Sequence, residues 1–275
     1  MDEEQQRRYG VRVDEDKSRQ LVTALARGLE VLRCFRPGEN YLGNHQIAER
    51  TGLPKATVSR LTFTLTQLGY LLYSETEGKY RLGTGVMALS YAFLSSMDIR
   101  ERARPLMQEV ADHSKVSVAL GTRDRLDMVY IERCRGAAAV TLLLDIGSRL
   151  PIGTSAMGRA YLAALPVRER ENLLYMMRET DPQGFPIIRS GVEDAMAQIA
   201  ERGFYASFSD WTEGVNAVGV PIILADGTTR MALNCGGPHF LLSRDFLEQD
   251  VGPRLVRVAN ELSAAPPQEL VRLSR

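Results

Sequence analysis

Small, hydroxylated and basic side chains gather at the start of a helix that the sequence predicts over residues 55–68. At about 100° per residue, they lie on the face opposite an apolar stripe and are therefore exposed to solvent. Such groups form hydrogen bonds with base edges and phosphates, and a helix start of this kind fits the major groove of DNA. The predicted DNA-contacting residues of this helix are Lys55, Ala56, Thr57, Ser59 and Arg60.

An apolar stripe orients this helix, because four apolar residues recur along it at steps of three and four. A shorter helix over residues 46–50 and a glycine-containing turn over 51–53 are predicted to precede it. A helix, a short turn and a second helix form the helix-turn-helix unit of DNA-binding proteins. The stripe consists of Val58, Leu61, Leu65 and Leu68.

A short hairpin is predicted directly after the second helix. Residues 70–73 and 79–82 favour strands, and the polar segment 74–78 joins them. Lys79 and Arg81 lie on the second strand, where they are placed to meet phosphate or the minor groove. A small helical domain with a solvated face is the alternative, but the turn, stripe, basic helix start and hairpin together favour a winged helix-turn-helix.

Several segments resemble one protein family. AERTGLPKATVSRL (48–61), LTQLGYL (65–71) and GKYRLG (78–83) resemble the winged helix-turn-helix of the IclR family of bacterial transcription regulators. GSRLPIGTSAMGRAYLA (147–163) and EGVNAVGVPI (213–222) resemble two signatures of that family's ligand-binding domain. The resemblance covers roughly residues 20–263. It implies an α+β fold, with an N-terminal winged helix-turn-helix and a C-terminal GAF/PAS-like α/β sensing domain joined by a helical linker.

The length of 275 residues fits two domains better than one. Basic and acidic residues both number 34, but residues 20–85 carry eight basic and five acidic residues, a net charge of +3. This weak basic excess is compatible with DNA binding. The expected segments are a mobile arm at 1–19, a DNA-binding domain at 20–85, a helical linker for dimerisation at 86–113, an effector-binding domain at 114–263 and a loose tail at 264–275.

The predicted linker starts with an unusually apolar helix. Val86, Leu89, Phe93 and Met97 recur at steps of three and four, and further apolar residues between them widen the apolar surface. We interpret this helix as a candidate dimer interface. Packing against its own domain is the alternative.

The hydrophobic period changes after residue 117, where alternating patterns indicate an antiparallel sheet with helices between its strands. Strands are predicted within 117–134, over 140–147 and within 204–238, and helices over 154–165, 173–177, 195–203 and 243–263.

Catalytic motifs are lacking. Ser155 follows Gly153 by two residues, but Met157 occupies the place of the last glycine of a nucleophile elbow. The three histidines have no metal-ligand spacing, and there is no phosphate-binding glycine loop. The three cysteines form no CxxC pair and are expected to be reduced thiols. We therefore predict no enzyme activity, no cofactor and no metal site.

A ligand site is expected at the start of the helix over 154–165, because its free N–H groups and positive dipole end suit a carboxylate. In the IclR family, which this sequence resembles, members that bind small oxo-acids use backbone amides there and polar side chains on later strands. Ala217, Gly236 and the bulkier Met157 depart from that pattern and favour a larger, partly apolar acid, such as an aromatic one. The alternative is that these residues are only core and turn. The resemblance assigns to the effector site Ser155, Ala156, Met157, Ser207, Ala217, Asn234 and Gly236.

These features imply a ligand-responsive transcription regulator that binds a two-fold operator as a dimer or tetramer. Its expected partners are double-stranded operator DNA, a small carboxylic acid and copies of itself. A DNA-binding protein whose C-terminal domain only oligomerises is the alternative, and either a repressor or an activator fits. The sequence has no signal peptide and no apolar run near 18 residues, so a cytoplasmic protein without membrane contact is expected.

Overall fold

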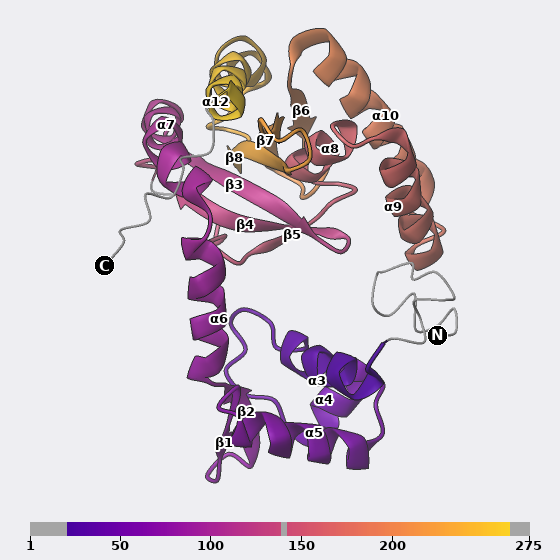
Figure 1. Cartoon of the computed structure of the whole chain (residues 1–275). Coiled ribbons are helices and arrows are strands. Elements are labelled where there is room, and N and C mark those ends of the chain that lie inside the picture. Colours follow the sequence, from indigo (N-terminus) through magenta and orange to yellow (C-terminus); the bar gives the residue numbers. More distant parts are fainter. Residues whose placement is uncertain (1–20, 139–141, 265–275) are drawn as a thin grey trace. The chain divides into compact units, whose positions relative to one another are not determined.

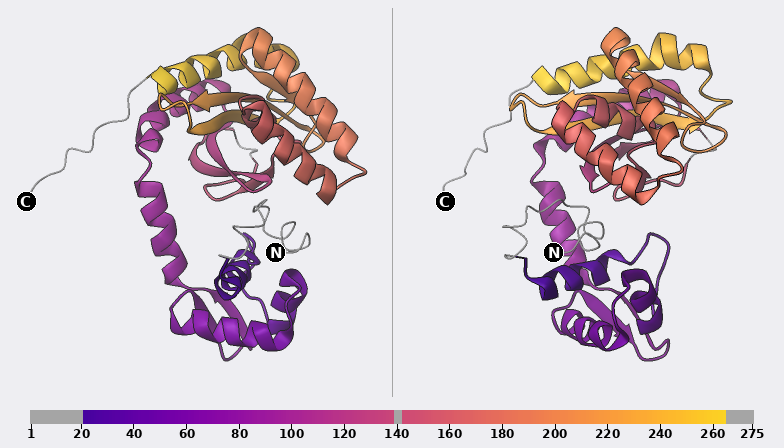
Figure 2. Two further views of the ribbon diagram at one scale, coloured as in Figure 1. Left: turned by 45° about the vertical axis from the view of Figure 1, so that its right-hand side comes forward. Right: turned by 90° about the vertical axis from the view of Figure 1, so that its right-hand side faces the viewer.

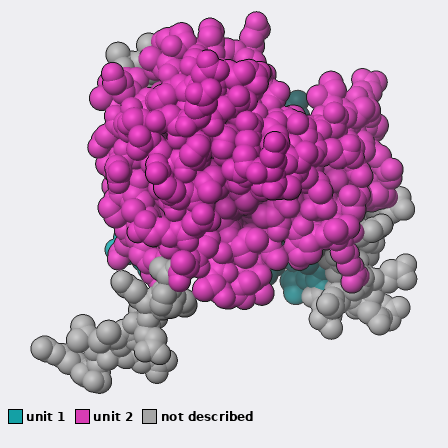
Figure 3. All heavy atoms as spheres, turned by 90° about the horizontal axis from the view of Figure 1, so that it is seen from above, with its two compact units in different colours: residues 1, 12–96 teal, residues 2–11, 97–275 magenta. Residues whose placement is uncertain are grey.

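The computed structural model describes residues 21–138 and 142–264, which form two compact units. Figure 3 colours the two units, which divide between residues 96 and 97. This point falls inside the predicted linker at 86–113, so the first linker helix belongs to unit 1 and the second to unit 2. The predicted arm, and the predicted tail beyond residue 264, lie outside the described residues.

Unit 1 consists of helices and a two-stranded antiparallel hairpin around a small apolar core (Figure 1). Its core brings together residues of the helix-turn-helix, such as Ile47 and Val58, with Leu71 of the hairpin. The predicted helix-turn-helix and hairpin are therefore confirmed. The elements are α3 (Thr23–Arg33), α4 (Asn44–Thr51), α5 (Lys55–Gln67), β1 (Leu71–Ser74), β2 (Lys79–Leu82) and α6 (Thr84–Ser95).

The apolar stripe of α5 ends earlier than predicted. Val58 is fully buried, but Leu68 is 63% exposed, so its assignment to the stripe was wrong. Helix α5 ends at Gln67, and Gly69 then takes the left-handed conformation with φ 76°, which turns the chain away. Thr62 is buried instead, and its hydroxyl donates a hydrogen bond to the carbonyl of Val58 at 2.9 Å.

Helix α6 contributes little to the core of its own unit, since none of its residues is buried within the described structure. Four of its large apolar side chains are more than half exposed to solvent. Exposed apolar side chains in this number on one helix are typical of an interaction site. The exposed fractions are 73% for Met87, 58% for Leu89, 71% for Tyr91 and 52% for Phe93.

Unit 2 is built on a six-stranded antiparallel sheet with the order β5-β4-β3-β8-β7-β6. A helix precedes the sheet, helices connect β5 to β6, and a helical segment follows β8. The elements are α7 (Asp98–Ser114), β3 (Ser117–Asp124), β4 (Asp127–Cys134), β5 (Arg149–Pro151), α8 (Ala156–Ala163), α9 (Val167–Thr180), α10 (Phe185–Arg202), β6 (Tyr205–Phe208), β7 (Val215–Ile223), β8 (Arg230–Pro238), α11 (Arg244–Phe246), η1 (Leu247–Val251) and α12 (Gly252–Ala264).

The two faces of the sheet carry different helices (Figure 2). Helices α7 and α12 pack on one face, whereas α8 packs on the other and is itself covered by α10. Neighbouring residues of β8 illustrate the two faces, because successive side chains of a strand alternate. The Cys235 thiol contacts Ser114 of α7, whereas Asn234 and Gly236 face a cavity beside α8.

The strand predicted over residues 140–147 is not formed in its described part, residues 142–147. The N–H of Ser148 donates to the carbonyl of Asp145 at 2.8 Å, and Gly147 has φ 87°. This turn ends the extended chain, and the edge strand β5 begins only at Arg149. The segment 142–144 instead runs alongside the cavity described below.

Candidate DNA interface and ligand cavity

The predicted DNA-contacting residues of α5 lie at its exposed N-terminal end. Pro54 occupies the N-cap position, and the helix begins at the next residue. Thr57 is half-buried, and the other four predicted residues are exposed. Those exposed residues are Lys55, Ala56, Ser59 and Arg60.

The neighbouring helix fixes the side chain of Ser59. The amide Nδ2 of Asn44, the first residue of α4, donates a hydrogen bond to Ser59 Oγ at 3.1 Å. This contact joins the two helices of the helix-turn-helix at their exposed ends. It therefore orients a hydroxyl group on the surface predicted to face DNA.

The hairpin is held against the helix-turn-helix by a backbone bridge. The N–H groups of Leu42 and Tyr80 each donate to the carbonyl of the other residue at 2.9 Å. On the same strand as Tyr80, Lys79 is half-buried and Arg81 is exposed. The two basic residues of the hairpin therefore have a fixed position relative to α5.

Replacing Arg60 by alanine is expected to weaken binding to a specific operator by about 1–3 kcal/mol, the usual contribution of a guanidinium group that reads a base edge. Lys79→Ala is the matched control, because a lysine that neutralises one phosphate should weaken all sequences alike and lower the slope of log K against log salt by about one unit. Gel-shift titrations with operator and scrambled duplexes at several salt concentrations measure both effects. If a folded Arg60→Ala variant keeps the wild-type preference for the operator over the scrambled duplex, Arg60 does not read a base.

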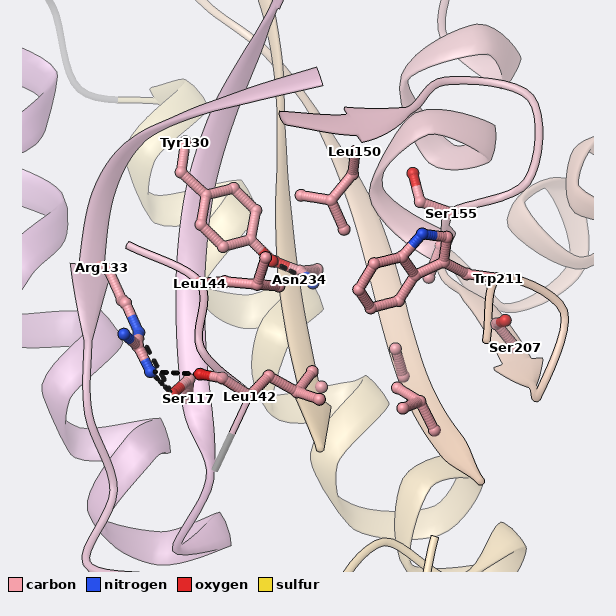
Figure 4. Close-up of a pocket in the computed structure, with 14 residues that line it drawn as sticks. Ser117, Tyr130, Arg133, Leu142, Leu144, Leu150, Ser155, Ser207, Trp211 and Asn234 are labelled. Atoms are coloured by element: carbon pink, nitrogen blue, oxygen red, sulfur yellow. Dashed lines mark hydrogen bonds between the residues drawn. The ribbon is translucent and has the colours of Figure 1, made fainter. Parts of the chain in front are cut away.

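A cavity opens on the α8 face of the sheet, and we call it the sheet cavity (Figure 4). Apolar side chains form much of its wall, among them Leu142, Leu144, Leu150, Trp211 and Val215. Six of the seven residues predicted for the effector site also line it, although they come from α8, β6, β7 and β8. These six are Ser155, Ala156, Ser207, Ala217, Asn234 and Gly236.

Met157, the seventh predicted residue, is not among the residues that line the sheet cavity. It is fully buried in the core of unit 2. A Cβ atom placed on Gly121 would lie only 2.4 Å from the Met157 sulfur, so this glycine provides the space for the methionine. The prediction that Met157 packs against a ligand is therefore replaced by a core position.

An arginine that the sequence analysis did not assign lines one end of the sheet cavity. Arg133 of β4 is only 8% exposed. Its guanidinium donates hydrogen bonds to Ser117 Oγ at 2.8 Å and to the carbonyl of Leu142 at 3.3 Å. Burial is the main cause of a lowered pKa of Arg133, and the carboxylate of Asp145, 3.9 Å from its guanidinium, opposes that shift.

A buried amide and a phenol lie together in the same cavity. Asn234 Nδ2 donates to the hydroxyl of Tyr130 at 3.1 Å, and burial raises the pKa of Tyr130 to about 12, which keeps the phenol neutral. Asn234 is only 7% exposed, and its Oδ1 has no hydrogen-bond partner among the described residues. An unpartnered buried amide oxygen is costly unless a ligand donor or water satisfies it.

The start of α8 closes the other end of the sheet cavity. Ser155 is the N-cap, and its hydroxyl accepts a hydrogen bond from the Gly158 N–H at 3.1 Å and donates one to the carbonyl of Pro151 at 2.7 Å. Ala156 begins the helix and faces the cavity. The positive end of the α8 dipole is therefore directed toward this space.

An ion-paired cluster beside the cavity holds the loop that carries Trp211. Arg159 of α8 is 4% exposed and pairs with Asp210 at 3.1 Å, while the hydroxyl of Tyr205 donates to Asp210 at 2.7 Å. Arg159 also donates to the Tyr205 hydroxyl. Since Trp211 follows Asp210 directly, this cluster keeps the indole over the cavity.

Within the residues that the structure describes, no group of three or more His, Cys, Asp or Glu side chains has a metal-binding arrangement. Among the described helices, none combines the length and apolar character that crossing a lipid bilayer requires.

Comparisons with known proteins cover both units. Residues 24–75 match the IclR helix-turn-helix domain, and residues 91–264 match the family described as bacterial transcriptional regulator IclR C-terminal. The HTH-type transcriptional regulator TsaQ1/TsaQ2 of Comamonas testosteroni is 34% identical over 91% of this chain and 92% of its own length. The Pca regulon regulatory protein of Pseudomonas putida is 31% identical over 88% of this chain and 83% of its own.

A solved structure shows the same fold over nearly the whole chain. The crystal structure of an IclR family transcriptional regulator from Brucella abortus is 46% identical and has a TM-score of 0.85. The match covers 94% of this chain and 99% of that one.

Proposed function

Since the chain belongs to the IclR family of bacterial transcription regulators, we propose that it binds a two-fold operator as a dimer or tetramer and that a small organic acid in the sheet cavity controls this binding. The family assignment makes the protein a DNA-binding transcription regulator and not an enzyme. We place it in the cytoplasm, where operator DNA is accessible. The sheet cavity is the observation that carries the proposed response to a ligand.

The polar groups of the cavity support an acid with polar groups at both ends. Figure 4 shows Arg133 and Ser155 on different sides of the cavity, with Tyr130 and Asn234 between them. A carboxylate at the start of α8 meets the positive end of the helix dipole. Asn234 Oδ1, which has no hydrogen-bond partner among the described residues, can then accept a hydrogen bond from a hydroxyl farther along the ligand.

The apolar wall supports a ligand that is more than a short oxo-acid. Leucines at 142, 144 and 150 and the indole of Trp211 surround the central part of the sheet cavity. Ligand sites are typically apolar with a few placed polar groups, and this pattern suits a ring that carries a carboxylate. An aromatic acid is therefore the proposed effector class.

The narrowness of the cavity favours a second candidate function. The free volume of the cavity is about 20 Å³, which holds little more than one water molecule. A benzene ring enters only if the wall moves outward. A C-terminal unit that only oligomerises, with no effector, would need no such movement.

Titration of the protein with benzoate and 4-hydroxybenzoate separates these two functions. Trp211 is the only tryptophan of the sequence and lines the cavity, so its fluorescence reports events there. We expect a saturable change with the acids and about 10- to 100-fold weaker binding of benzyl alcohol, because hydrogen bonds to a charged group contribute about 1.5–3 kcal/mol.

Absorption by the ligands is corrected with free tryptophan, and Trp211→Phe should remove the signal. If neither acid gives a saturable change, the proposed effector class is wrong. The purely oligomerising C-terminal unit then becomes the better account.

A further inference from the structure

A buried carboxylate joins β4 to the beginning of α7. Glu132 is 2% exposed. Its Oε2 accepts a hydrogen bond from Arg100 at 3.0 Å, and its Oε1 accepts from Arg104 at 2.9 Å and from the N–H of Arg133 at 3.0 Å. Arg100 also donates from Nε to the carbonyl of Ile131 at 2.8 Å. Both carboxylate oxygens are thus engaged, which is what keeps a buried charge in place.

The next residue of the same strand faces the sheet cavity. Because successive side chains of a strand point to opposite faces, Glu132 points toward α7 while Arg133 lines the cavity. The two side chains share one peptide unit, whose N–H donates to Glu132 itself. A shift of Arg133 toward a ligand therefore acts directly on the group that holds α7.

Glu132 binds the N-terminal part of α7, which is the part closest in sequence to the DNA-binding unit. Arg100 and Arg104 are four residues apart and lie in the first two turns after Asp98. Helix α6 ends at Ser95, so only two residues separate it from α7. The units divide at this connection. The orientation of the α7 start consequently sets the direction in which the chain leaves unit 2 toward α6.

We propose that Glu132 is the positioning residue that couples occupation of the sheet cavity to the DNA-binding unit, through its ion pairs with Arg100 and Arg104. This inference rests on the proposed function. A ligand at Arg133 favours one of two placements of β4 against the α7 start, and each placement suits a different spacing of the DNA-binding units. Such a ligand must bind the two placements with different affinity, since equal affinity shifts no equilibrium.

The test compares the affinity for 4-hydroxybenzoate with and without operator, using a duplex that the protein selects from a random-sequence pool. In the wild type we expect the ratio of the two affinities to lie between about 5 and 150. In Glu132→Gln, which keeps the shape but removes the charge, we expect a ratio near one. The affinity for each partner alone should change by less than about threefold.

Two further variants keep the test decisive. Arg104→Gln removes one partner of Glu132 and should also lower the ratio. Because Arg104 is 61% exposed, its replacement should leave the fold intact, so this variant tests the inference if Glu132→Gln fails to fold. Asp250→Asn is the control, because Asp250 pairs with His113 at the opposite end of α7 at 2.7 Å. It should keep the wild-type ratio.

The possible outcomes show whether the proposed function fails or only the role of Glu132. A ratio of one in the wild type overturns the proposed function and this inference with it. A wild-type ratio above one that persists in folded Glu132→Gln and Arg104→Gln overturns the inference alone. An equal loss of the ratio in Asp250→Asn also overturns it, because the effect would then follow from any loosening of α7.

Discussion

Replacing Phe93 by aspartate should dissociate the protein into monomers and weaken operator binding by on the order of 10²- to 10⁴-fold, the usual gain from linking two binding modules. Phe93 is 52% exposed and lies among other exposed apolar residues of α6, so we expect a second copy of the chain to cover it. A carboxylate buried in such a contact without a partner is strongly unfavourable. Light scattering measures the molecular mass, and gel-shift titration measures the affinity.

Val167→Asp is the control for Phe93→Asp. Val167 is 67% exposed at the start of α9 in unit 2, outside the apolar residues of α6. It adds the same charge and should leave the assembly intact. If Phe93→Asp keeps the mass of the wild type, the interface between copies lies elsewhere.

Replacing Ala217 by phenylalanine should lower the affinity for an aromatic acid by about 10- to 100-fold, because overfilling a packed site costs about 1–3 kcal/mol. Ala217 of β7 lines the sheet cavity, and its Cβ would be 3.2 Å from a Cβ placed on Gly236. A ring added at this position is expected to occupy space in the cavity. Fluorescence of Trp211 and calorimetry measure the loss.

Ile223→Phe is the control on the same strand, because Ile223 is 43% exposed at the far end of β7. It should bind the acid as well as the wild type does. Acid binding by Ala217→Phe with unchanged affinity would place the effector outside the sheet cavity. Substitution of Met157 would not serve this purpose, since a polar residue at this fully buried position is expected to destabilise unit 2.

The helix-turn-helix was predictable because its determinants are local. The spacing of Val58 and its apolar neighbours, the turn before Pro54 and the polar segment between the strands all lie within about 40 residues of one another. The structure places α4, α5 and the hairpin within a few residues of the predicted bounds. The error at Leu68 arose because periodicity alone does not show where a helix stops.

The cavity was predictable only in part. Six residues came from the resemblance to a family, whereas Arg133 and Trp211 did not. Arg133 was detectable as one of two adjacent charged residues, with Glu132, near the end of a largely apolar strand. Its direction, however, depends on the irregular register between β3 and β4 near Leu120 and Gly121. Trp211 lies in a loop, where no periodicity indicates which way a side chain points.

The misplacement of Met157 has the same origin. It follows Ala156 at the start of α8, and the helix start does face the cavity. The side chain of Met157 turns into the core because Gly121 of β3 leaves room for it. A contact between residues 36 positions apart is not readable from local sequence. The same holds for residues 142–147, whose turn competes with the strand that their apolar composition favours.

Calorimetry of the wild-type protein with 4-hydroxybenzoate, with and without its selected operator duplex, tests the central claim most directly. Linkage is reciprocal, so an acid that changes operator affinity must have its own affinity changed by operator to the same extent. We predict a change of about 5- to 150-fold, which corresponds to a coupling of about 1–3 kcal/mol. Measurable binding of the acid with the same affinity in both titrations would contradict the account, because the acid would then occupy the protein without controlling its binding to DNA.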